Sequence, residues 1–103
     1  MAQDRHIYGE VNSPTGLRTV FRDIRKDVAT AKSRPALSEL YKRAGYLITL
    51  THAPAWRKKF GSKASSMRQV AKTEFTSTAR KINSRAHAIG AEADYDTKWG
   101  AGR

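Results

Sequence analysis

Basic side chains are densest near the middle of the chain. Four of the seven residues from Arg57 to Lys63 are lysine or arginine, and Arg68 and Lys72 follow. Gly61 and the serines after it combine a turn that lacks side-chain bulk with hydroxyls and free amides at the start of a helix. Lysine and arginine neutralise phosphates, whereas hydroxyls and backbone amides hold them in register. This segment therefore predicts a phosphate-binding site.

A second basic strip lies nearer the N-terminus. Its members are Arg18, Arg22, Arg25 and Lys26. We expect them to project from the side of a helix opposite the apolar stripe, with Asp23 and Asp27 on one flank. Like-charged pairs such as Arg18–Arg22 each cost about 0.2–0.5 kcal/mol on an isolated helix. Phosphate binding and a solvated, solubilising face explain this strip equally well.

A third group of cations, Lys72, Arg80 and Lys81, borders a predicted helix face that is rich in serine, threonine and amide side chains. Serine and threonine are weak helix formers, so this face suits the close approach of a DNA backbone or another helix, or is polar filler. The nucleic-acid-binding residues predicted overall are Arg18, Arg22, Arg25, Lys26, Arg57, Lys58, Lys59, Lys63, Arg68, Lys72, Arg80 and Lys81.

Neither a metal site nor a catalytic group is predicted. The chain has no cysteine, and His6, His52 and His87 lie in separate segments without a second ligand three or four residues away on a predicted helix. The pair Asp94 and Asp96 lacks the glycine and distal glutamate of a calcium loop. Phosphate-loop, dinucleotide-binding and nucleophile-elbow motifs are missing. We therefore expect no cofactor and no enzymatic activity.

Helical periodicity and proline positions place the elements that must carry these side chains. Apolar residues recur at intervals of three and four from Leu17 to Ala31, from Leu37 to Thr51 and from Met67 to Ala93. Ser13-Pro14 and Arg34-Pro35 indicate helix starts, and Pro54–Phe60 indicates one short helix. Gly90 lies inside the last stripe and can end that helix early.

The fold class that follows is all-α: a small helical bundle of three main helices and one short helix. A length of 103 residues fits one domain. The predicted division is an extended N-terminal arm at 1–12, a helical domain at 13–93 and a C-terminal tail at 94–103 that is loose at its end. The short connections predict that consecutive helices are antiparallel.

The net charge is +11, and its distribution is uneven. Residues 34–90 carry +10, with only Glu39 and Glu74 opposing, whereas residues 91–103 carry −1. Charge of one sign repels itself in a compact domain and is better tolerated when a partner neutralises it. No apolar run approaches a membrane span, and residues 1–10 lack the apolar core of a signal peptide. A cytoplasmic protein without membrane contact is expected.

These observations predict a small basic nucleic-acid-binding protein that grips the phosphate backbone. Duplex DNA is slightly favoured over RNA because no aromatic-rich single-strand module is visible. The alternative is a non-enzymatic adaptor subunit that meets an acidic protein, with Tyr46, Leu50 and Trp99 at an interface. A homodimer remains open, because three helices of this size bury limited area alone.

Overall fold

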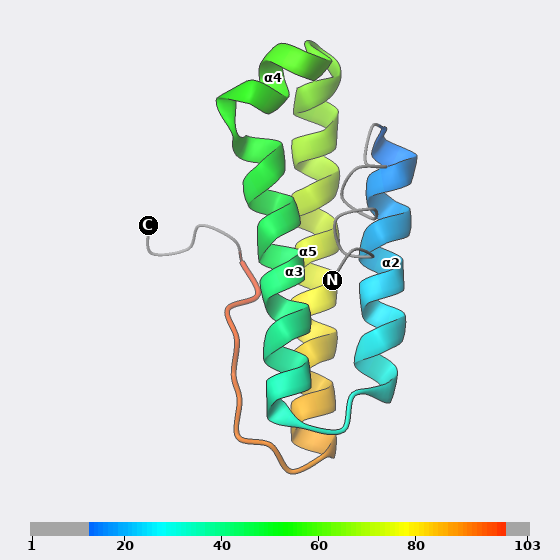
Figure 1. Ribbon diagram of the computed structural model, residues 1–103, viewed down its shortest axis with the longest axis vertical. Helices are drawn as coiled ribbons and strands as arrows, with labels where there is room; N and C mark the ends of the chain where they lie inside the picture. Colours follow the sequence, from blue (N-terminus) through cyan, green and yellow to red (C-terminus); the bar gives the residue numbers. More distant parts are fainter. Residues whose placement is uncertain (1–12, 99–103) are drawn as a thin grey trace.

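The computed structural model describes residues 13–98, so the predicted arm at 1–12 and the end of the tail, with Trp99, lie outside it. Within the described residues there are four helices and no strand: α2 (Pro14–Thr30), α3 (Arg34–His52), α4 (Pro54–Phe60) and α5 (Lys63–Ala88). The predicted all-α bundle is confirmed. Figure 1 shows α3 running antiparallel to both α2 and α5, with α4 at the upper end of the bundle.

Local sequence explains where the helices begin. The Ser13 hydroxyl accepts a hydrogen bond from the Gly16 amide at 3.0 Å, and the Ser33 hydroxyl accepts one from the Ala36 amide at 3.3 Å. A proline also lies in the first turn of α2, α3 and α4. Serine satisfies an amide that the helix leaves unpaired, and proline has no amide hydrogen to satisfy.

The core lies where α5 packs against both α2 and α3, which contact each other less. The predicted stripes supply it: the largest fully buried side chains are Phe21, Phe75, Leu17, Leu37, Leu47, Ile48, Met67, Ile82, Val28, Thr51 and Thr78. Helix α5 is also the longest of the four, with 26 residues. None of the four helices is long and apolar enough to cross a bilayer.

Helix α5 ends at Ala88, before the predicted stripe reaches Ala93. Gly90 adopts a φ of 74°, its amide donates to the His87 carbonyl at 3.2 Å, and the Ala91 amide donates to the Ala86 carbonyl at 2.8 Å. This pair of bonds is the Schellman arrangement, in which a glycine with positive φ closes a helix. The chain therefore reverses and returns along α3 (Figure 1).

The returning segment is extended and docked. Alternate residues are half-buried, and those between them are exposed; the inward set is Ala91, Ala93, Tyr95 and Thr97. The Tyr95 ring stacks on Tyr41 at 4.5 Å, and its hydroxyl shares a short hydrogen bond with Ser38. Asn83 donates to the Tyr95 carbonyl at 2.9 Å and accepts from its amide at 2.8 Å. The start of the tail is thus part of the folded domain.

Candidate nucleic-acid interface

Helix α4 presents its three basic residues outward because its aromatic residues fix the opposite side. Trp56 is buried in the core, and its ring lies 4.5 Å from that of Phe60. Arg57, Lys58 and Lys59 are all exposed. The predicted cluster is therefore available to a ligand, and the aromatic pair packs within the protein.

A hollow lies at the junction of α4 and α5. It is lined by Arg57, Gly61, Ser62, Ala64, Ser65 and Arg68. Ser62 occupies the N-cap position, but its side chain makes no capping hydrogen bond. Arg68 is half-buried, and its Nε donates to the Thr51 carbonyl at 2.7 Å in the last turn of α3. Arg68 therefore also joins α5 to α3, a role that its sequence position does not reveal.

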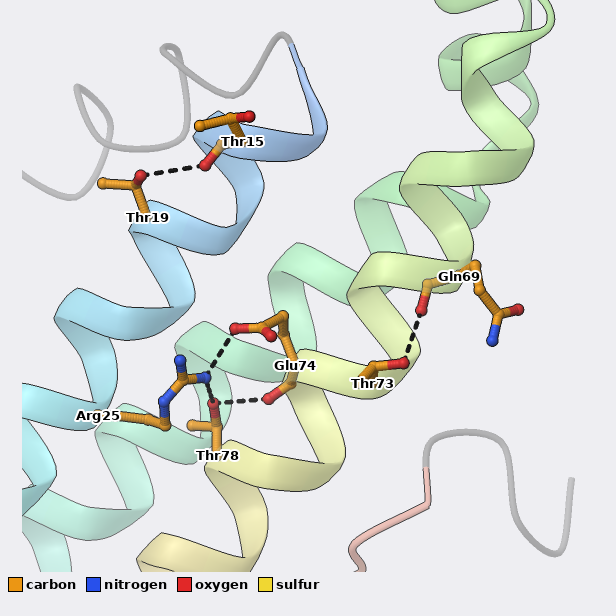
Figure 2. A network of polar contacts seen from close by, with 7 residues as sticks. All are labelled: Thr15, Thr19, Arg25, Gln69, Thr73, Glu74 and Thr78. Atoms are coloured by element: carbon orange, nitrogen blue, oxygen red, sulfur yellow. Dashed lines mark hydrogen bonds and ion pairs between the residues drawn. The ribbon is translucent and has the colours of Figure 1, made fainter.

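The outward half of α5 carries the remaining predicted cations. Lys63, Lys72, Arg80 and Lys81 are exposed. At about 100° per residue, the other three lie within about 100° of Arg80 around the helix axis. Between them is an open hollow lined by Lys72, Thr73, Thr76, Ser77 and Arg80. Thr73 donates to the Gln69 carbonyl at 3.2 Å, as Figure 2 shows.

On α2, the structure confirms an exposed basic strip for three of the four predicted residues. Arg18, Arg22 and Lys26 are exposed, whereas Arg25 is half-buried. The expectation that Arg25 projects away from the apolar stripe is wrong. Its Cα lies only about 40° around the helix from Phe21, which is in the core, so its side chain starts at the edge of the stripe. From there it reaches across to α5.

Arg25 takes part in a polar network between α2 and α5. Its Nη1 donates to Glu74 Oε1 at 2.9 Å and to Thr78 Oγ1 at 3.2 Å, while Thr78 Oγ1 donates to the Glu74 carbonyl at 2.7 Å (Figure 2). The side chains of Arg25 and Glu74 are only 21% and 18% exposed. Sequence reasoning missed both partners on α5. A polar Thr78 within an apolar stripe was the available signal.

Another arginine, Arg85, lies outside the predicted set and also joins helices. Arg85 is half-buried, and its Nε donates to the Ala31 carbonyl at 2.8 Å, just beyond α2. A cation near the carbonyl end of a helix is favourable for the helix dipole. Arg68 and Arg85 thus attach the two ends of α5 to the ends of α3 and α2.

Carboxylates are unevenly placed over the described residues. Glu74, engaged by Arg25, is the single acidic residue of α4 and α5. The exposed acidic residues lie on α2, on α3 and on the returning segment: Asp23, Asp27, Glu39, Glu92, Asp94 and Asp96. The exposed surface of α4 and α5 therefore carries seven cations and no carboxylate: Arg57, Lys58, Lys59, Lys63, Lys72, Arg80 and Lys81.

Of the three residues predicted at a protein interface, the structure describes Tyr46 and Leu50. Leu50 is half-buried and packs against the core. Tyr46 is 51% exposed, and it is the single large hydrophobic residue with high exposure between residues 13 and 98. Trp99 lies outside the described residues.

Over residues 13–98, no group of three acidic or histidine side chains is positioned to hold a metal ion. Comparisons of the chain with protein-family models, with curated proteins and with solved structures give no match.

Proposed function

We propose that this protein binds nucleic acid through the phosphate backbone, with duplex DNA preferred, and that it acts as a binding protein in the cytoplasm. The observation that carries the proposal is the surface of α4 and α5, where seven cations are exposed and the single carboxylate is paired with Arg25. A polyanion removes the mutual repulsion of such a surface.

The dimensions of this surface suit a duplex. The 26 residues of α5 extend about 39 Å along the helix axis. One turn of B-form DNA is about 34–36 Å. The exposed cations of α5 lie between Lys63 and Lys81, about 27 Å along this axis. A duplex aligned with α5 would therefore place somewhat less than one turn of its backbone against them. Hydroxyl side chains between them, such as Thr73 and Ser77, are small enough to let a sugar-phosphate backbone approach.

A salt titration with random duplex DNA tests this function. Contacts to about five to eight phosphates give a slope of log K against log salt of about −4 to −7. Lys58→Glu/Lys59→Glu should weaken binding about tenfold or more and make the slope shallower by about 2, because two phosphate contacts are lost.

A matched control separates local contacts from total charge. Lys42→Glu/Lys98→Glu changes the net charge by the same amount at exposed positions on α3 and the returning segment. It should weaken binding less than about threefold. Identical curves for the wild type and Lys58→Glu/Lys59→Glu would contradict the proposed surface. A wild-type chain that binds neither duplex nor single strands at low salt, but forms a stable complex with an acidic protein, would contradict the function itself.

A further inference from the structure

The helices α2 and α5 form a groove that holds a different set of cations from the α4–α5 surface. The groove has a volume of about 280 Å³ and is lined by Thr15, Arg18, Thr19, Arg22, Arg25 and Glu74. It contains three arginines and no lysine, against one carboxylate. The side chains that line this groove therefore carry a net charge of +2.

The carboxylate in this groove is already bound within the protein. Arg25 donates to Glu74 and Thr78, and Thr78 donates in turn to the Glu74 backbone (Figure 2). Glu74 is thus held by Arg25. The same contacts fix the Arg25 guanidinium, so the cation nearest α5 is set in place before any ligand arrives.

The other two arginines are differently placed. Arg18 and Arg22 are exposed, lie one helical turn apart and both line the groove. The acidic residues of α2, Asp23 and Asp27, are not part of the groove lining. Within residues 13–98, the one ion pair in the groove joins Arg25 to Glu74. The repulsion between Arg18 and Arg22 would be relieved by an anion bound between them.

The chemistry of these side chains narrows the ligand. A guanidinium is a planar fork whose two N–H groups match two oxygens of a phosphate, whereas an ammonium acts as a compact point charge. Arg18 and Arg22 are separated by about 6 Å along the helix, so they can hold successive anionic groups of one chain. We infer that the α2–α5 groove is a phosphodiester site, which receives one strand of the nucleic-acid backbone and orients it on the protein.

This inference rests on the proposed function and divides it between two regions. In the groove, arginine geometry would fix the position of the strand, with Arg25 held by Glu74. On α4, Lys58 and Lys59 would contribute charge without demanding one geometry. The two regions should therefore respond differently when the charge is kept and the shape of the cation is changed.

The test is a charge-conserving exchange at each place. Arg18→Lys/Arg22→Lys should reduce affinity for a random duplex about tenfold, because each lysine keeps the charge but loses the two-point contact. The slope against salt should stay as in the wild type, since the number of charges is unchanged. The matched control, Lys58→Arg/Lys59→Arg, should change affinity less than about twofold.

A second variant in the same groove is expected to raise DNA affinity instead of lowering it. Glu74→Gln retains an oxygen that can accept from Arg25 and removes the groove's one negative charge. It should raise affinity about threefold. Its folding is checked by its urea denaturation midpoint, so that weaker binding through misfolding is recognised.

The outcomes separate this inference from the proposed function. If Arg18→Lys/Arg22→Lys and Glu74→Gln both bind as the wild type, while Lys58→Glu/Lys59→Glu binds weakly, the groove is not the orienting site and the function stands. If the wild type itself does not bind DNA, the proposed function fails and the groove inference fails with it.

Discussion

Helix α5 borders two grooves, and the chain treats them in opposite ways. The groove beside α3 is filled by the protein's own residues 91–98, whereas the groove beside α2 is open and lined with arginines. In the first, Asn83 and Tyr41 bond to the backbone of the returning segment. In the second, Arg25 is hydrogen-bonded to Glu74 of the protein itself, whereas Arg18 and Arg22 line the groove and are exposed.

The difference separates side chains that hold the fold from side chains available to a partner. Where polar groups are satisfied by the protein itself, their loss should lower stability and leave binding unchanged. Where cations are exposed beside each other, their loss should lower binding and leave stability nearly unchanged. Substitutions in the two grooves should therefore produce opposite patterns in the two measurements.

The largest effect on stability is expected at Asn83. Asn83→Ala removes both hydrogen bonds to the Tyr95 backbone, at 2.9 and 2.8 Å, and leaves those groups to find water. The free energy of unfolding should fall by about 1–3 kcal/mol, measured by urea denaturation. Affinity for duplex DNA should stay within about twofold of the wild type.

Ser84→Ala is the control for Asn83→Ala, since Ser84 is an exposed neighbour on the same helix. Its stability should change by less than about 0.5 kcal/mol. A loss of DNA affinity in Asn83→Ala, with stability unchanged, would reverse the assignment of the two grooves.

A smaller effect concerns the turn that sends the chain into the α3 groove. Gly90 has a φ of 74° and Gly45 lies within α3, and neither site has a neighbouring atom within 4 Å of an added Cβ. Gly90→Ala should destabilise by about 1 kcal/mol through backbone strain alone. Gly45→Ala should stabilise by about 0.5–1 kcal/mol, because alanine is the better helix former.

The same change from glycine to alanine is thus expected to lower the free energy of unfolding at Gly90 and to raise it at Gly45. Urea denaturation midpoints measure both effects. Equal effects would mean that the turn at Gly90 does not hold the returning segment in solution.

The helices were predictable because their signals are local. Ser13-Pro14, Arg34-Pro35 and Pro54 each lie at a helix start, and the apolar stripes supply the core. Local periodicity also misled at one end. The three-and-four spacing runs from Ile89 across Gly90 to Ala93, although Ala93 faces inward from an extended segment. The fact that an apolar residue faces inward does not by itself distinguish a helix from an extended segment.

The site was less predictable because its geometry depends on distant pairs. Arg25 and Glu74 are separated by 49 positions in the sequence, and how α2 packs on α5 decides whether they meet. Exposure could be anticipated for Arg18, Arg22 and Lys58 from the helix period alone. No local pattern shows that Arg68 and Arg85 bond to carbonyls at the ends of other helices.

The smallest expected effect tests whether the acidic side of the bundle lies outside the DNA-binding surface. Asp94 and Asp96 are exposed on the returning segment, which runs along α3 on the side away from α2 (Figure 1). Charges are largely screened beyond about 8 Å at physiological salt.

Asp94→Asn/Asp96→Asn should therefore raise DNA affinity less than about twofold in fluorescence anisotropy at that salt concentration. Asp23→Asn/Asp27→Asn, which adds the same charge on α2 beside the arginine strip, should raise it about threefold. A tenfold gain in DNA affinity for Asp94→Asn/Asp96→Asn, without a gain for Asp23→Asn/Asp27→Asn, would place the DNA against α3. The open groove beside α2 would then have to be assigned to another ligand.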